Sequence, residues 1–365
     1  MKNHRWPTLC LILGIFLSLF GCGRNPEPPE VLSFDFSDYA DCSVEAFLDG
    51  KLICRRDFSH YFAIDPETKT ETEFTGAVPD CYTGTNGYAV TSGKYYSCVM
   101  SPDYTVTLYE IDCEHRSVTP LADYFDVSPM VYLWETPDGI LQLKTPSLEA
   151  NRRTYFDLFH PDTGETELVI QGQGNDYFAH ASVYENTLYV LVSHRSEDGP
   201  STWGLQAYDL GTYQLLKETS LEAVSAFLRQ TRIDEMEVLG DYVYFANWSD
   251  QGIIAKISDE GVTPVVERES LRCASCFDRS AQTSERLFYS QPTDECLLFQ
   301  FDTGETRIFR VERQEGFELW SVMIDGDRVL LHETQISQTK LENNKEIFRI
   351  FDYNDFISQG ASDSD

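Results

Sequence analysis

The chain has 365 residues and a formal net charge of −32, with 42% hydrophobic and 13% aromatic residues. That apolar content is enough for two average domains or for one large repeat domain. A surface this acidic repels phosphate backbones and anionic lipid head groups, which excludes nucleic acid as a partner and leaves cationic partners allowed.

Residues 1–21 have the pattern of a cleaved export signal. Lys2, His4 and Arg5 provide a positively charged start, and residues 9–20 form an apolar stretch. This stretch is shorter than the roughly 20 residues that a membrane-spanning helix needs, so we expect removal of the segment rather than permanent insertion. Loss of Lys2 and Arg5 makes the mature chain two charges more negative.

The end of this segment, Leu19-Phe20-Gly21-Cys22, resembles the bacterial lipobox. The resemblance implies that Cys22 carries a lipid such as palmitate, becomes the mature N-terminus and anchors the protein at the extracytoplasmic face of the cell membrane. An ordinary secretory signal with a chance cysteine is the alternative. Residues 22–30 are polar and rich in proline, which predicts an extended tether.

One internal repeat extends over residues 31–358. Its most regular part is a β-rich run that closes on an aromatic or aliphatic residue followed by a polar one, usually Asp, before a turn. The seven copies end at Asp65, Asp112, His160, Asp209, Ser258, Asp302 and Asp352. The successive spacings are 47, 48, 49, 49, 44 and 50 residues, which indicates a repeat domain.

Turn sequences divide each repeat further. Asp49-Gly50, Asp138-Gly139 and Gly240-Asp241 stand between apolar runs, where a short hairpin needs positive φ angles. A later turn, such as Thr163-Gly164 or Thr303-Gly304, leads to one more short strand. Each repeat is therefore expected to form four antiparallel strands.

Four antiparallel strands repeated every 40 to 50 residues predict an all-β fold, a β-propeller with seven blades. The seventh repeat is incomplete, because residues 353–359 are too few for an outer strand. Residues 31–36 alternate as a strand should, and we expect them to complete the last blade and close the ring. Residues 221–230 predict a helix, and residues 359–365 predict a disordered acidic tail.

Two turns, Phe159-His160-Pro161-Asp162-Thr163-Gly164 and Phe301-Asp302-Thr303-Gly304, resemble the aliphatic-Asp-x-x-Thr-Gly turns of quinoprotein-like bacterial propellers. The docking tryptophan that follows this glycine in that family is missing from every repeat. The resemblance therefore implies the architecture without a quinone or other cofactor. As a whole, the chain resembles bacterial surface lipoproteins of uncharacterised function that carry a propeller.

Beyond the lipidation residue, eight cysteines remain in the mature chain. They are Cys42, Cys54, Cys81, Cys98, Cys113, Cys273, Cys276 and Cys296. An even number outside the cytoplasm permits disulfides, although spacing does not define the connectivity. Proximity suggests Cys81 with Cys98, and Cys273 or Cys276 with Cys296, while buried thiols are the alternative.

Cys273-Ala274-Ser275-Cys276 also has the spacing of a redox or metal pair. Only Cys296 lies nearby as a further ligand, with no histidine, so a structural role is the preferred interpretation. Elsewhere the sequence contains neither a His-x-x-x-His pair nor a nucleophile elbow. We therefore predict no metal site and name no catalytic residue.

Asp234, Glu235 and Glu237 precede the turn at Gly240, on what is expected to be the innermost strand of a blade. Glu235 and Glu237 share a face of that strand. Two carboxylates near a channel mouth suit acid-base chemistry on a glycan or the binding of a cation. Solvated acidic residues are the alternative.

The four tryptophans of the predicted propeller fall in different blades. They are Trp134, Trp203, Trp248 and Trp320. They suit either a sugar-stacking platform or the packing of blades against one another.

The repeats specify a scaffold, and no motif specifies a chemistry. Our leading hypothesis is a monomeric, non-enzymatic lipoprotein whose propeller binds a protein or carbohydrate ligand. One alternative is a carbohydrate-active hydrolase or lyase, which would need carboxylates from different blades to converge. Another is an envelope-assembly factor.

Overall fold

The structure is a computed structural model that describes residues 31–39, 42–57, 59–78, 88–91, 93–125, 127–128, 131–146, 153–195, 200–230, 233–247, 251–276, 284–291, 293–335 and 345–359. Apart from Val31, these residues belong to one compact unit, Leu32–Asp365. The predicted signal (1–21), Cys22, the tether (22–30), Cys81, Trp248 and residues 360–365 of the predicted tail lie outside the described residues.

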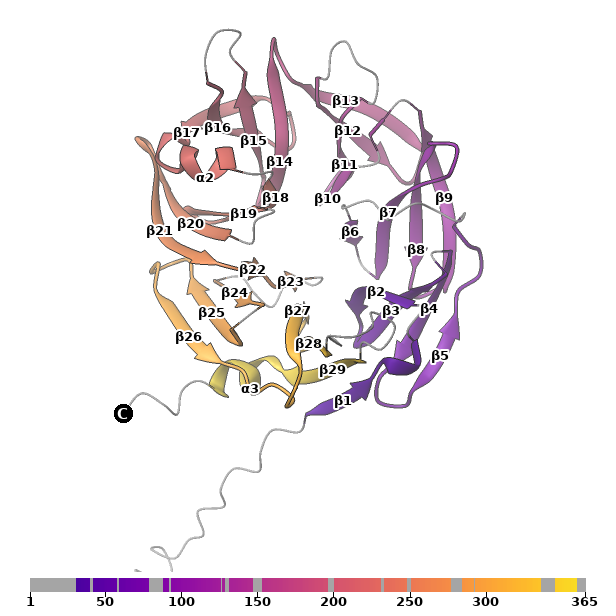
Figure 1. Ribbon diagram of the computed structural model, residues 1–365. Coiled ribbons are helices and arrows are strands. Elements are labelled where there is room, and N and C mark those ends of the chain that lie inside the picture. The colour runs from indigo at the N-terminus through magenta and orange to yellow at the C-terminus, as the bar shows by residue number, and fades with distance from the viewer. Residues whose placement is uncertain are drawn as a thin grey trace, which may run out of the picture. The chain divides into compact units, whose positions relative to one another are not determined.

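Seven β-sheets form the described chain, as predicted, and six of them are four-stranded antiparallel meanders (Figure 1). The strands of blade 1 are β2 (Cys42–Leu48), β3 (Lys51–Arg56), β4 (His60–Asp65) and β5 (Thr70–Glu73). Those of blade 2 are β6 (Tyr88–Thr91), β7 (Lys94–Met100), β8 (Val106–Asp112) and β9 (Ser117–Tyr124). Those of blade 3 are β10 (Tyr132–Thr136), β11 (Gly139–Lys144), β12 (Tyr155–His160) and β13 (Glu165–Gln171).

The next three blades repeat the same order of strands. Those of blade 4 are β14 (Asp176–Tyr184), β15 (Thr187–His194), β16 (Thr202–Asp209) and β17 (Leu215–Ser220). Those of blade 5 are β18 (Ile233–Leu239), β19 (Tyr242–Asn247), β20 (Gln251–Ser258) and β21 (Gly261–Glu269). Those of blade 6 are β22 (Leu271–Cys273), β24 (Glu285–Ser290), β25 (Glu295–Gln300) and β26 (Thr306–Arg310).

Blade 7 closes the ring with the N-terminal strand, which confirms the prediction. Its order is β1-β29-β28-β27-β23, built from β1 (Leu32–Asp35), β29 (Lys345–Asp352), β28 (Arg328–Gln335), β27 (Glu318–Asp325) and β23 (Ser275–Cys276). Strand β1 pairs antiparallel with β29, so that Leu32 faces Ile350 and Asp35 faces Ile347.

Blade 7 differs from the expected four strands because β23 adds a fifth. After β22 the chain leaves blade 6, and β23 pairs in parallel with β27 at the inner edge of blade 7. A bare inner edge presents unpaired backbone N–H and C=O groups, and this crossing segment pairs some of them.

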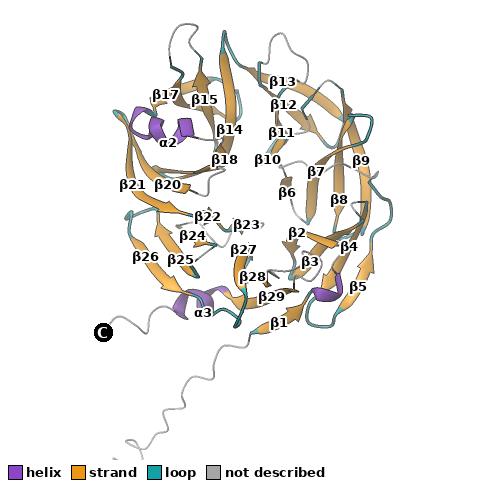
Figure 2. Cartoon of the chain, viewed as in Figure 1, coloured by secondary structure: helices purple, strands orange, loops and turns teal. Residues whose placement is uncertain are grey.

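Helices are few and short (Figure 2). The predicted helix near residues 221–230 is confirmed as η2 (Glu222–Val224) followed by α2 (Ser225–Gln230), and η1 (Ser37–Tyr39) follows the closing strand. The sequence did not predict α3 (Tyr353–Ser358), where the Asp352 carboxylate accepts hydrogen bonds from two backbone N–H groups of the first turn. None of the helices in the described ranges is long and apolar enough to cross a membrane.

The hydrophobic cores lie between neighbouring blades. One buried cluster joins blades 7, 1 and 2, and five others join the successive pairs from blades 2 and 3 to blades 6 and 7. The ring of Tyr242 in blade 5, for example, meets that of Phe299 in blade 6 edge-on, with centroids 4.9 Å apart. Each sheet therefore buries both faces, and each blade depends on its two neighbours.

The two faces of the ring carry different connections. On one face, which we call the hairpin face, two-residue turns such as residues 49–50 and 240–241 join the first two strands of a blade. At Asp49 and Gly50 both φ angles are positive, as the sequence predicts. On the opposite face, which we call the loop face, the second strand meets the third, through connections as long as residues 145–154.

Closing the ring should contribute much of the stability. Phe34 in β1 is 1% exposed and packs in the cluster that joins blades 7, 1 and 2. We expect Phe34→Ala to lower the free energy of unfolding by about 3–5 kcal/mol, through lost apolar burial and the cavity left behind. Denaturant unfolding measures this, with exposed Ser33→Ala as the matched control. A loss below about 1 kcal/mol would contradict the role assigned to β1.

Candidate functional site

The three acidic residues singled out from the sequence lie on β18, the first strand of blade 5. First strands occupy the inner side of the ring, where β14 contacts both β10 and β18 (Figure 1). Met236 is buried while Glu235 and Glu237 on either side of it are not, which is the expected alternation. Both glutamates face Cys273 on β22 of blade 6, so they share a face as predicted.

A β-bulge gives Asp234 an unexpected position. The register between β18 and β19 shifts between Ile233 and Glu235, so Asp234 is the extra residue on its strand. In a regular strand Asp234 and Glu235 would point to opposite faces. With the bulge, both carboxylates reach the same guanidinium group, that of Arg272 on β22.

Two arginines of blade 6 neutralise most of the negative charge of these three carboxylates. Arg272 Nη1 lies 2.9 Å from Asp234 Oδ2 and 3.6 Å from Glu235 Oε1. Arg286 Nε donates a hydrogen bond of 3.0 Å to Glu237 Oε1, and its side chain is only 7% exposed. Three carboxylates thus contact two guanidinium groups, and Glu235 makes the longest of these ion pairs. Neither arginine was predicted from the sequence, although Arg272 stands next to Cys273.

Glu235 titrates near neutral pH. Burial raises the pKa of its carboxyl group to about 7, against the opposing effects of Arg272 and the backbone N–H of Cys273. The Tyr244 hydroxyl lies 3.1 Å from Glu235 Oε2, but its single hydrogen is shared with the carbonyl of Leu271 at 2.7 Å. The Glu235 side chain is nevertheless 38% exposed, so solvent or a ligand can reach it.

The cysteines near this site do not form the disulfides suggested by sequence proximity. Cys273 Sγ donates a hydrogen bond of 3.1 Å to Glu237 Oε2, and both Cys273 and Cys296 are thiols. Cys273 lies on β22 and Cys296 on β25, with β24 between them, so their backbones are about 9–10 Å apart. A disulfide needs Cα atoms within about 7 Å. This excludes a disulfide between Cys273 and Cys296, and Cys276 on β23 is also a free thiol.

The remaining cysteine predictions have different outcomes. Burial raises the pKa of the Cys273 thiol well above its usual value, which disfavours the thiolate needed for redox or metal chemistry. No group of three His, Cys, Asp or Glu side chains in the described segments is arranged to hold a metal ion. Cys98 is buried between blades 2 and 3, and its suggested partner Cys81 lies outside the described residues.

The tryptophans of the described chain do not assemble into one platform. Trp134 on β10 packs against Phe156 at 6.0 Å between ring centroids, and Trp203 on β16 packs into the cluster between blades 4 and 5. Trp320 on β27 is 52% exposed. Trp134 and Trp203 therefore contribute to the packing of the blades and not to a sugar-stacking platform.

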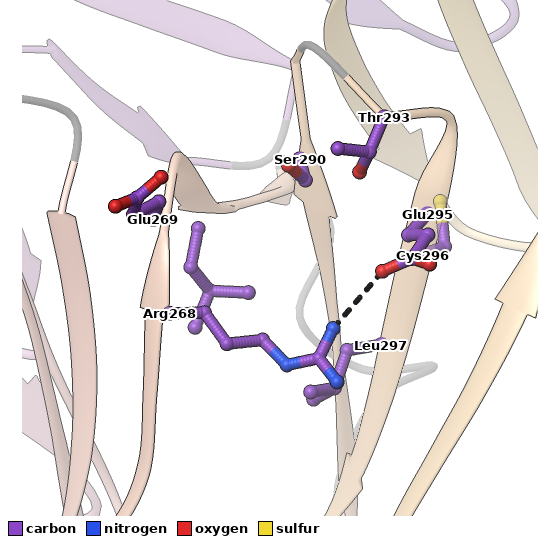
Figure 3. A pocket seen from close by; sticks show the side chains of 8 residues that line it. Arg268, Glu269, Ser290, Thr293, Glu295, Cys296 and Leu297 are labelled. Carbon is purple, nitrogen blue, oxygen red and sulfur yellow. Dashed lines mark hydrogen bonds and ion pairs between the residues drawn. The ribbon is translucent and has the colours of Figure 1, made fainter.

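A separate cleft lies where blade 5 passes into blade 6 on the loop face. It has a volume of about 290 Å³. In Figure 3, Arg268 reaches across the cleft to Glu295, whereas the carboxylate of Glu269 points away from this pair. Arg268 Nη1 and Glu295 Oε2 are 3.1 Å apart, so this ion pair joins β21 to β25. This cleft could not be predicted from the sequence, because its lining comes from strands of two blades.

Seven sheets around a ring, closed by pairing the first strand with the last, define a β-propeller, a class whose architecture suits a binding or interaction scaffold. No family model matches this chain, and no curated protein matches it. Among solved structures, the crystal structure of Sqt1 from Saccharomyces cerevisiae is 10% identical with a TM-score of 0.48, covering 86% of this chain and 96% of that chain. The resemblance to quinoprotein-like propellers stays a prediction.

The pKa of Glu235 predicts how stability changes with pH. An unfolded glutamate loses its proton near 4.5, whereas folded Glu235 keeps it to about 7, so stability falls as pH rises through this window. Glu235→Gln removes the titrating carboxyl group and with it this loss of stability at higher pH. We expect it to raise the free energy of unfolding at pH 8 by about 1 kcal/mol, a value reduced for solvent screening, and by almost nothing at pH 4.5.

Urea unfolding at both pH values measures this difference, and Glu267→Gln on exposed β21 is the matched control. An equal change at pH 4.5 and pH 8 would show that Glu235 does not titrate in this window.

Proposed function

We propose that the protein is a lipid-anchored lipoprotein of the extracytoplasmic face of the cell membrane, and that its propeller is a scaffold that binds a ligand. The observation that carries the binding role is the architecture. A rigid closed ring presents a loop face with long connections and a cleft, and binding residues commonly lie on such loops supported by a rigid scaffold.

The arrangement of the carboxylates also supports binding rather than hydrolysis. A glycosidase needs two carboxyl groups on either side of the scissile bond, one as acid and one as base or nucleophile. Asp234, Glu235 and Glu237 all come from one strand, and Asp234 and Glu237 are held by arginines. Burial raises the pKa of Glu235 to about 7, which suits proton transfer near neutral pH, but no second carboxylate from another blade contacts it among the described residues.

The anchoring proposal comes from the sequence of residues 1–30. Eight residues separate Cys22 from Val31, so a lipid on Cys22 would hold the propeller within about 28 Å of the membrane. The ligand would then belong to that membrane or to the layer next to it.

Metabolic labelling tests the anchor. We expect labelled palmitate to be incorporated into the full chain and to be lost in Cys22→Ala, because that thiol is the proposed acylation site. Cys10→Ala serves as the control, since Cys10 lies in the segment to be removed. Label that persists in Cys22→Ala would refute lipidation at this residue.

Capture from native membranes tests the scaffold. The full chain, extracted in mild detergent, is expected to retain a reproducible protein or glycan ligand after washing. A Phe34→Ala chain, whose ring closure is weakened, should retain less of it. The comparison is made above the melting temperature of Phe34→Ala, where that variant is unfolded. If both chains then retain the same amount of ligand, the folded ring is not needed for binding. If the unmodified chain retains no ligand, the scaffold proposal is wrong.

A further inference from the structure

One histidine of blade 4 lies between two carboxylates. His194, at the loop-face end of β15, has Nδ1 2.8 Å from Asp176 Oδ1 on β14 and Nε2 2.9 Å from Glu218 Oε1 on β17. The three side chains belong to the second, first and fourth strands of the blade. The contact with Glu218 therefore reaches across β16, which separates β15 from β17 in the sheet.

The ring of His194 satisfies both carboxylates only when it is protonated. A neutral imidazole carries a hydrogen on one nitrogen, so it donates to one carboxylate and turns a lone pair toward the other. The imidazolium ion donates from both nitrogens, and such charge-assisted hydrogen bonds are the strong ones. Burial alone would lower the pKa of His194, but the hydrogen bond to Asp176 and the charge of Glu218 outweigh burial and raise this pKa above 6.5.

The sequence of β16 leaves room for this contact. A Cβ atom on Gly204 would lie 2.8 Å from Glu218 Oε1 and 3.2 Å from His194 Nε2, so a larger residue there would displace one of them. Two positions further, Gln206 donates a hydrogen bond of 2.8 Å to Glu218 Oε2 and accepts one of 2.7 Å from the Tyr208 hydroxyl. Both oxygens of Glu218 are therefore held in place.

The other groups around the ring add no competing charge. Cross-strand pairing places His194 on the face of blade 4 that packs against blade 3. The buried residues that blade 3 brings to this face are apolar, namely Leu141, Leu143, Phe156 and Ile170. Burial raises the pKa of Tyr208 to about 12, so its hydroxyl stays uncharged. Arg195 lies over the Tyr177 ring, which alternation places on the opposite face. Within the described residues, the two carboxylates are the charged groups that contact His194.

We propose that His194 is a pH-sensitive clamp, which joins the loop-face ends of β14, β15 and β17 when protonated and releases one of them when it loses its proton. Deprotonation leaves one carboxylate without its hydrogen bond and removes the positive charge between Asp176 and Glu218. A histidine whose pKa is raised by folding stabilises the fold fully below its unfolded pKa of 6.5, and this contribution is lost as pH rises through the folded pKa. The loop face therefore becomes looser at blade 4 as pH rises. The clamp requires neither the proposed lipid anchor nor a bound ligand.

An NMR titration of the histidine rings tests the protonation. It uses the full chain in mild detergent, and His194→Gln identifies the signal. Asp176→Asn and Glu218→Gln should each lower the pKa of His194, because each removes one carboxylate charge. Gly204→Ala changes no charge but should also lower this pKa, because the added methyl group displaces Glu218 from the ring. Glu165→Gln, on an exposed part of β13, is the matched control and should leave the pKa unchanged. Thermal unfolding verifies that each variant folds.

Amide hydrogen exchange tests the release. After correction for the intrinsic effect of pH on exchange, raising the pH from 5.5 to 9 should reduce protection at the loop-face ends of β15 and β17 about tenfold, as expected for the loss of one hydrogen bond to a charged group. Strands β25 and β26 of blade 6 contain no histidine and are the internal reference. In His194→Gln, protection at the ends of β15 and β17 should no longer depend on pH.

Three results would contradict the clamp. The first is a His194 pKa at or below 6.5 that neither Asp176→Asn nor Glu218→Gln changes. The second is protection at β15 and β17 that falls equally with pH in the unmodified chain and in His194→Gln. The third is a pKa that responds to the carboxylate variants while protection does not respond to pH, because the contact would then be an ion pair that releases nothing.

Discussion

The pairing of β1 with β29 is the constraint on which the rest of the structure depends. Every blade is an open sheet that buries both faces, so none has a complete core by itself. The ring supplies each blade with two neighbours only if its last sheet also meets its first, and that sheet is completed by β1. The four paired residues of β1, which include buried Phe34, and the buried Phe36 that follows them thereby stabilise sheets that they do not touch.

The same packing explains how so acidic a chain keeps charges inside the ring. Lys144 is 1% exposed, 3.1 Å from Asp157 Oδ2 and 3.4 Å from the centre of the Tyr124 ring in blade 2. Glu333 is fully buried and accepts two hydrogen bonds from Arg349, at 2.7 Å and 3.0 Å. Buried charges persist only when they are paired in this way. Glu235 departs from the pattern, because burial raises the pKa of its carboxyl group to about 7 and Arg272, which it shares with Asp234, offsets this only in part.

Sequence alone predicted what is local or periodic. The seven copies correspond to the third strands of the blades from β4 to β29, since alternation and turn residues determine strands within a few positions. The closing strand was predictable because the seventh repeat lacked an outer strand. The bulge at Asp234, the crossing of β23 and the arginine partners were not, because each depends on residues brought together from different blades. The cleft was missed for the same reason, and α3 because its single turn and a half has no periodicity to detect.

Ring closure must also wait for the last strand of the described chain to be synthesised. Strand β1 is among the first parts of the described chain to emerge during synthesis, and its partner β29 is the last strand to appear. Contacts between residues so distant in sequence form slowly. A chain exported from its N-terminus would therefore hold Phe34 and Phe36 uncovered until almost all of it had arrived, and a truncated chain would keep them uncovered. Only a chain that extends through β29 buries these two phenylalanines. A chain that ends earlier leaves them exposed to proteases and chaperones, which recognise apolar residues.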